Sequence, residues 1–243
     1  MKLAKQLWIT IVLLTGAILF FGLSGVDVWV QRHFYNPLTH QWLIDTNNEV
    51  FKFIFYDGIK RLLIIIAVLF LLGLILGWKK EWMKSYRRGL IIVVLSSIAV
   101  PLAVGSLKAV SNMPCPKSLD IFGGAYPHTC VWDKYTAKDC HLEKQKCWPA
   151  GHASGGFALL SLVFFFHSRK NKIAAASTAL VIGWSMGSYK MLIGDHFLSH
   201  TVITMILAWL LILLIVKAVD RVIKDVKCFE CSDSATSIKL ESK

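Results

Sequence analysis

The chain has 243 residues, of which 55% are hydrophobic, and its mean hydropathy is +0.56. Soluble domains are about half apolar even when glycine is counted, so this composition excludes a soluble globular protein and predicts an integral membrane protein. A net charge of +12 is also typical of nucleic-acid-binding proteins. Here the basic residues lie in clusters between apolar runs and form no single stripe with interleaved aromatics, so we do not expect nucleic acid as a partner.

Six apolar runs predict six membrane-spanning helices. In chain order they cover about residues 7–25, 62–78, 89–107, 153–166, 173–189 and 198–216. Most approach the ~20 residues that cross a bilayer, and the fourth does so if its helix begins at Pro149, which suits a first helical position. The first run is too long for a signal peptide and no Ala-x-Ala site follows it. We therefore expect an all-α fold, a polytopic six-helix transmembrane bundle formed by residues 1–227, with a disordered cytoplasmic tail at 228–243.

The distribution of positive charge predicts the orientation of the bundle in the membrane. The short segments after the second and fourth runs, "WKKEWMKSYRR" and "HSRKNK", are strongly basic, and so is the chain after the sixth run. Basic residues in short loops mark the cytoplasmic side. Both termini are therefore expected in the cytoplasm, and the outer loops are about residues 26–61, 108–152 and 190–197.

The second outer loop holds an even set of cysteines, namely Cys115, Cys130, Cys140 and Cys147. In an oxidising compartment such a set predicts one or two disulfides, but four cysteines allow three full pairings and the sequence does not choose among them. A zinc site is the alternative, and the absence of C-x-x-C from this loop disfavours it. Cys228 and Cys231 do form C-x-x-C in the tail, where we interpret them as a thiol pair without a metal.

Ionisable residues gather at the outer ends of four predicted helices. They are Lys108, His152, Lys190, Asp195, His196 and His200. Such groups at membrane depth are costly and usually functional. Lysines and the free N–H groups of a helix beginning near Gly151 suit a phosphate, while one histidine can attack phosphorus and another can protonate the departing oxygen. The pattern predicts a phosphoryl-transfer site.

Three motifs in this region resemble those of the type 2 phosphatidic acid phosphatase family. The chain reads "KAVSNMPCP" at 108–116, "PAGH" at 149–152 and "YKMLIGDHFLSH" at 189–200. The family has a Lys with Arg-Pro seven residues on, then Pro-Ser-Gly-His, then Ser-Arg followed by a His and an Asp. The spacing is kept in all three motifs. The resemblance implies a helical membrane phosphatase that works through a phosphohistidine, with no metal and no other cofactor.

The resemblance also implies roles for individual residues. His196 matches the nucleophile and His152 matches the general acid. The phosphate-binding positions that it implies are Lys108, Lys190, Ala150 and Gly151.

Five positions depart from the family pattern. Lys190 and Cys115 stand where the family has arginines, which removes the bidentate fork that arginine offers a phosphate. Ala150 and Tyr189 stand where it has serines. His200 replaces the aspartate that orients the nucleophile. It shares a helical face with the nucleophile if the last helix already begins there, and a neutral His200 can accept the nucleophile's N–H and fix its tautomer.

The expected function is hydrolysis of a phosphate monoester or pyrophosphate of a lipid, such as lipid A, undecaprenyl pyrophosphate or phosphatidylglycerol phosphate. The wording "CWPAGHASGG" and "HFLSH" resembles a bacterial branch of the family, so we expect an inner-membrane enzyme whose site faces the periplasm. The alternatives are a lipid-to-lipid phosphotransferase and a non-catalytic transporter or scaffold. Asp195 and Arg61 are candidates to supply the missing charge. A metal held by His196 and His200 is disfavoured because the Glu of H-E-x-x-H is missing.

Overall fold

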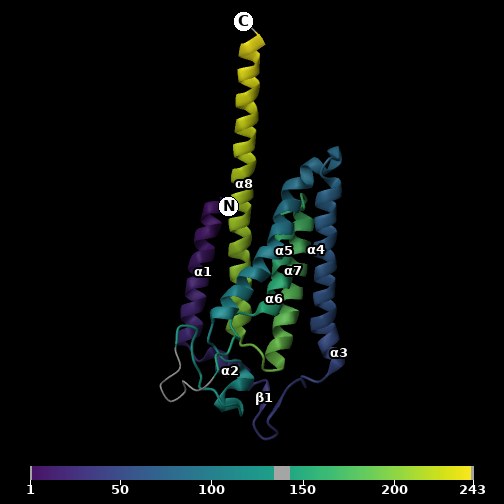
Figure 1. Ribbon diagram of the computed structural model, residues 1–243. Helices are drawn as coiled ribbons and strands as arrows, with labels where there is room; N and C mark the ends of the chain where they lie inside the picture. Colours follow the sequence, from purple (N-terminus) through teal and green to yellow (C-terminus); the bar gives the residue numbers. More distant parts are fainter. Residues whose placement is uncertain (1, 134–142, 242–243) are drawn as a thin grey trace.

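The computed structural model describes residues 2–133 and 143–241, and the side chains of the last helix as far as residue 225. In this part of the chain, six helices run alternately in opposite directions along one bundle (Figure 1). They are α1 (Leu3–Leu23), α4 (Gly58–Gly77), α5 (Lys84–Val110), α6 (Gly151–Ala158), α7 (Arg169–Leu192) and α8 (Leu198–Glu241). A 3₁₀ segment, Leu159–Phe164, continues α6. Both termini lie at one end of the bundle, and we call the other end, which carries residues 24–57, 111–150 and 193–197, the loop end.

Four helical segments in the described ranges are long and apolar enough to cross a membrane. They are Leu3–Leu23, Glu49–Gly77, Glu81–Val110 and Leu198–Asp225. The segment Gly151–Phe164 is apolar but shorter, and α7 has 24 residues, several of them polar. The sequence-based prediction of an all-α membrane protein is confirmed.

Helix α6 lies at the centre of the bundle, in contact with α5, α7 and α8. Small residues allow it to approach α7 closely, because a Cβ added to Gly156 would lie 2.7 Å from the Cα of Gly183. Phe157, which is fully buried, fills the space beside Gly183. Close backbone packing of this kind holds the short helix in place, although its own length does not span a bilayer.

The fourth predicted helix starts two residues later than expected. Helix α6 begins at Gly151, and its N-terminal neighbour Ala150 donates its backbone N–H to Thr204 Oγ1 of α8 at 2.9 Å. The Ala150 amide is therefore bound to another helix, and Pro149 lies before the helix instead of in its first turn.

Two other helices are longer than predicted. Helix α3 (Glu49–Lys52) and a π-helical turn (Phe53–Asp57) precede α4 at the loop end and continue directly into it. The second long helix therefore starts before residue 62. Helix α8 continues to Glu241, where the sequence predicts a disordered tail over residues 228–243. Residues 217–243 contain neither proline nor glycine, the two residue types that most strongly interrupt a helix.

A small cap covers the loop end of the bundle. Helix α2 (Val26–Arg32) leads into an antiparallel hairpin of β1 (Tyr35–Asn36) and β2 (Gln41–Trp42). The rings of Tyr35 and Trp42 lie 5.3 Å from that of Phe122, and this aromatic cluster packs on the loop between α7 and α8. Gly194 in that loop has a φ of +74°, and a Cβ there would lie 2.4 Å from the Trp42 ring. Glycine is required because both the backbone conformation and the ring exclude a side chain.

Asp27 caps the start of α8. Its Oδ1 accepts the Ser199 backbone N–H at 2.9 Å, and the side chain is only 4% exposed. A carboxylate at a helix N-terminus satisfies a free amide and interacts favourably with the helix dipole. Burial raises the pKa of Asp27 from 3.8 to about 6, against the opposing effect of its hydrogen bonds to Ser199.

We expect Asp27→Ala to lower the free energy of unfolding by about 1–2 kcal/mol, because the amide at the start of α8 loses its acceptor. Asp27→Asn keeps an acceptor oxygen and should stay close to the parent protein. The folded protein keeps the proton of Asp27 up to about pH 6, whereas the unfolded chain releases it near pH 3.8. The contribution of this proton to the free energy of unfolding therefore falls as the pH rises from 3.8 towards about 6. The asparagine variant should lack this pH dependence. Thermal unfolding in detergent at several pH values measures both effects. Equal losses in the two variants would contradict the capping role.

Candidate active site

The ends of four helices bring the predicted site residues together at the loop end. Lys108 lies in the last turn of α5, His152 in the first turn of α6, Lys190 in the last turn of α7 and His200 in the first turn of α8. His196 lies in the tight loop before α8, where its backbone N–H donates to the Lys190 carbonyl at 3.1 Å. Alternating helix directions produce this arrangement, because each of the four chain segments enters or leaves the bundle at the same end.

Three histidines form the centre of the site. His196 and His200 are buried, and their Nδ1 atoms share a hydrogen bond of 3.2 Å. The rings of His152 and His196 lie 6.0 Å apart, centroid to centroid. His196 Nε2 and His152 Nδ1 are buried and have no hydrogen-bond partner among the described residues. The two rings are therefore close enough for one small group to contact both.

The protonation state of His196 follows from its surroundings. Burial holds the pKa of His196 well below its usual value, and the nearby His200, Lys108, His152 and Lys190 lower it further. The ring is therefore neutral at neutral pH. When its Nδ1 donates to His200, its free Nε2 carries the lone pair that a nucleophile needs.

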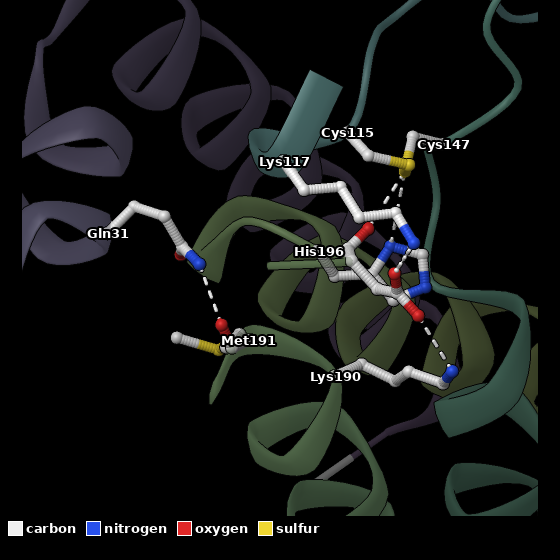
Figure 2. A network of polar contacts seen from close by, with 8 residues as sticks. Gln31, Cys115, Lys117, Cys147, Lys190, Met191 and His196 are labelled. Atoms are coloured by element: carbon white, nitrogen blue, oxygen red, sulfur yellow. Dashed lines mark hydrogen bonds and ion pairs between the residues drawn. A yellow bond between two sulfur atoms is a disulfide. The ribbon is translucent and has the colours of Figure 1, made fainter. Parts of the chain in front are cut away.

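Two lysines meet on one carboxylate next to His196 (Figure 2). Lys190 Nζ lies 2.8 Å from Asp195 Oδ2, and Lys117 Nζ lies 2.7 Å from Asp195 Oδ1. Burial alone would raise the pKa of Asp195, but the hydrogen bonds from both lysines outweigh it and hold that pKa below its ordinary value. The ammonium group of Lys190 also lies 4.8 Å above the Tyr56 ring. Asp195 is thus a charged part of the site, as the sequence suggested, whereas Arg61 forms no ion pair within the described ranges.

A disulfide joins the first motif to the second. Cys115 and Cys147 are bonded, which selects a pairing that the sequence left open. Cys147 is buried, and its sulfur lies 3.8 Å from His196 Nδ1 and 2.8 Å from the Asp195 carbonyl oxygen (Figure 2). Cys130 has a free thiol, and Cys140 lies outside the described residues. Where the family has an arginine, this chain therefore has Cys115, whose disulfide partner Cys147 contacts the loop that carries Asp195 and His196.

The predicted phosphate-binding backbone differs from the expectation at one position. The Ala150 N–H is already donated to Thr204, so it is not free for a phosphate. Gly151 begins α6, and the Lys108 side chain passes 3.8 Å from the place where a Cβ of Gly151 would be. The Ser154 hydroxyl donates to the Gly151 carbonyl at 2.6 Å and is turned towards its own helix.

One group of side chains at the site has the spacing of metal ligands. Donor atoms of Cys147, His196 and His200 lie within 4.8 Å of one another. The sulfur of Cys147 is bonded to Cys115, however, and a metal is held by thiolate rather than by disulfide sulfur. This leaves two histidines of the group as ligands, so the cluster fits a hydrogen-bonded pair better than a metal centre.

A cavity of about 340 Å³ opens beside His152 and extends between α4, α5 and α6. Its polar end is formed by Tyr56, Lys60, Gly151 and His152. Its remaining wall is mostly apolar, formed by residues such as Leu63, Ile66, Phe70, Val93, Pro101 and Leu159, and it also includes Ser97, Ser154 and Ser161. The cavity therefore connects His152 to the apolar interior of the bundle.

Sequence reasoning missed Lys117 and Tyr56. Lys117 follows the first motif by one residue, and that proximity was the only signal in the sequence. Tyr56 lies in a predicted loop that the structure folds as a π-helical turn.

A neutral buried histidine, a second histidine beside it and adjacent lysines are the groups that phosphoryl transfer requires. The model of the PAP2 superfamily matches residues 89–224, more than half of the chain and all three motifs. The chain therefore belongs to the PAP2 superfamily and is a membrane phosphatase.

One known protein is similar to the chain over a longer stretch than the three motifs. The chain is 26% identical over 193 residues to the lipid A 4'-phosphatase of Francisella tularensis subsp. novicida (strain U112). The similarity covers 76% of this chain and 82% of the relative. No solved structure matches the chain.

Proposed function

We propose that the protein removes a phosphate from a membrane lipid by way of a phosphohistidine on His196. One observation carries this proposal above all. His152 lies at the polar end of an apolar cavity that reaches into the bundle, and the His196 ring lies 6.0 Å from the His152 ring, centroid to centroid. A phosphate can lie between the rings while the hydrocarbon attached to it stays among apolar side chains.

In the first step, Lys108 and Lys190 bind the phosphate oxygens, and His196 Nε2 attacks phosphorus. A nitrogen–phosphorus bond forms as the bond between phosphorus and the lipid oxygen breaks. His152, protonated in the substrate complex, gives its proton to that oxygen, so the lipid leaves as an alcohol or a lower phosphate. His200 holds the Nδ1 side of His196 through the 3.2 Å hydrogen bond and directs Nε2 at the phosphate.

In the second step, water attacks the phosphohistidine. Neutral His152 accepts a proton from the water as the oxygen–phosphorus bond forms and the nitrogen–phosphorus bond breaks. Inorganic phosphate leaves, His196 is regenerated and His152 is again protonated. If the hydroxyl of a second lipid replaced water, the same step would be a phosphotransfer.

Lipid A bearing a phosphate is our first candidate substrate, because a relative that covers most of the chain is a lipid A 4'-phosphatase. Undecaprenyl pyrophosphate and phosphatidylglycerol phosphate are the next candidates. The cavity has roughly ten times the ~30 Å³ that one water molecule takes up in the liquid, which is room for a segment of a hydrocarbon chain.

We further propose that the protein lies in a bacterial inner membrane with its site facing the periplasm. The basic segments at 79–88 and 167–172 lie at the end of the bundle opposite the site, together with both termini. Basic short loops favour the cytoplasm, and a disulfide at the loop end favours an oxidising compartment.

Purified full-length protein incubated with these three lipids tests the proposal through phosphate release. We expect release from at least one of them in the presence of a chelator, and free lipid alcohol or lower phosphate as the second product. A parent protein that releases no phosphate and forms no phosphorylated lipid would favour the transporter or scaffold alternative. Formation of a new phosphorylated lipid without free phosphate would identify a transferase.

Filling the cavity should affect long lipids selectively. Ala67 lines the apolar wall, and Ala67→Phe would displace about two methylene groups of a bound chain, worth about 0.8 kcal/mol each. We expect kcat/KM for a long-chain lipid phosphate to fall about tenfold. Hydrolysis of p-nitrophenyl phosphate should stay within about twofold, because that substrate does not need the cavity.

Ala174→Phe is the matched control, since Ala174 is exposed on α7 and does not line this cavity. It should leave both substrates unaffected. An equal loss with both substrates in Ala67→Phe would mean that the cavity does not hold the lipid chain.

A further inference from the structure

We propose that Lys117 is a third phosphate-binding lysine of the site and supplies the charge that is missing at Cys115. This inference rests on the proposed phosphatase function and names a residue that the family motifs do not contain. Lys117 Nζ and Lys190 Nζ bind the two oxygens of one carboxylate, Asp195, at 2.7 and 2.8 Å. Asp195 immediately precedes His196, so both ammonium groups bind the residue beside the proposed nucleophile.

Covalent and hydrogen bonds hold the backbone of Lys117 in this position. The disulfide between Cys115 and Cys147 fixes the chain two residues earlier. The Lys117 N–H then donates to the Gly194 carbonyl at 2.9 Å, which ties the 3₁₀ turn Pro116–Ser118 to the nucleophile loop. An arginine at position 115 could not form this disulfide. Cys115 therefore takes the place of the family's arginine, and the adjacent turn supplies Lys117 instead.

The side chain of Lys117 is free to change partner. It is 46% exposed, whereas the Lys190 side chain is 13% exposed. A long exposed side chain can rotate at little cost, because it exchanges one hydrogen bond to water for another as it moves. Lys190 is the fixed cation of the pair, and Lys117 is the one that can follow a phosphate as it enters.

Lys117 also changes the charge around Asp195. The carboxylate cancels the charge of one lysine, so Lys190 and Asp195 alone carry no net charge. With Lys117 the group carries about +1, which leaves a positive charge for a phosphate. The carboxylate of Asp195 accepts from both ammonium groups, much as a phosphate with two free oxygens would do.

Binding of inorganic phosphate to the purified full-length protein tests the proposal without requiring turnover. We expect Lys117→Met to raise the Kd for phosphate about tenfold or more, because a hydrogen bond to a charged group contributes about 1.5–3 kcal/mol. Lys117→Arg should stay within about threefold of the parent because it keeps the charge. Lys144→Met, in an exposed part of the same loop, is the matched control and should bind like the parent.

Lys117→Gln provides a second neutral variant if the methionine variant does not fold, since glutamine can still donate to Asp195. It should weaken phosphate binding to a similar extent. Parent-like binding in either folded neutral variant would overturn the proposal. Failure of the phosphatase function itself would appear elsewhere, as a parent protein that binds phosphate but turns over no lipid phosphate.

Discussion

Replacing His196 with alanine should reduce phosphate release from a lipid phosphate by about four to six orders of magnitude, the range seen when a catalytic nucleophile is removed. The reason is specific to this position. His196 is buried and its Nε2 has no partner among the described residues, while its Nδ1 is held by His200. His167→Ala is the matched control, because His167 is exposed at the opposite end of the bundle. Activity near that of the parent in His196→Ala would exclude the covalent mechanism.

The low pKa of His196 also predicts how formation of the phosphoenzyme depends on pH. Burial keeps the pKa of His196 well below its usual value, so the ring stays neutral and nucleophilic below pH 6.5, where a free histidine becomes protonated. Rapid quenching with a labelled substrate should trap an acid-labile phosphoprotein in the parent and none in His196→Ala. The amount trapped should not decline between pH 7 and pH 6 through protonation of His196. A decline with a midpoint near 6.5 would contradict the buried, neutral ring.

Replacing His152 with alanine should reduce release from a lipid phosphate by about two to four orders of magnitude, the usual contribution of a general acid. The size of the loss should depend on the leaving group. A lipid alkoxide needs a proton in order to leave, whereas p-nitrophenolate leaves readily without one. We therefore expect a loss at least about tenfold smaller with p-nitrophenyl phosphate than with the lipid.

The two leaving groups separate general-acid catalysis from other roles of His152. A residue that only binds phosphate would lose the same factor with both substrates, since both carry the same phosphate group. Circular dichroism and the melting temperature of the variant establish that it is folded. Equal losses in a folded His152→Ala protein would therefore reject the general-acid assignment.

Much of the fold and of the site geometry could be predicted because it depends on short patterns. Apolar runs and basic loops identify helices and their directions, and these directions bring Lys108, His152 and Lys190 to one end. The spacing of four residues between His196 and His200 is also local. The two side chains meet in the structure, with their Nδ1 atoms 3.2 Å apart, although α8 begins only at Leu198.

The parts that sequence reasoning missed depend on contacts between distant segments. The choice of Cys147 as the partner of Cys115, and the ion pair between Lys117 and Asp195, arise from the folding of the long loop between α5 and α6, which has no hydrophobic period. Likewise, α6 begins at Gly151 because Thr204 of α8 binds the Ala150 amide. A pattern within one segment carries no information about such a partner.

The cavity that leads from His152 into the bundle has a further consequence for how this phosphatase meets its substrate. Lifting a lipid chain into water costs about 0.8 kcal/mol per methylene group, or about 8 kcal/mol for ten of them. On the proposed function, a chain that passed sideways from the bilayer into the bundle would avoid this cost, and the encounter would take place by diffusion in two dimensions. We then expect the rate to follow the mole fraction of substrate in the membrane surface. Inert phospholipid should slow turnover by dilution within the plane even when the total amount of substrate is unchanged.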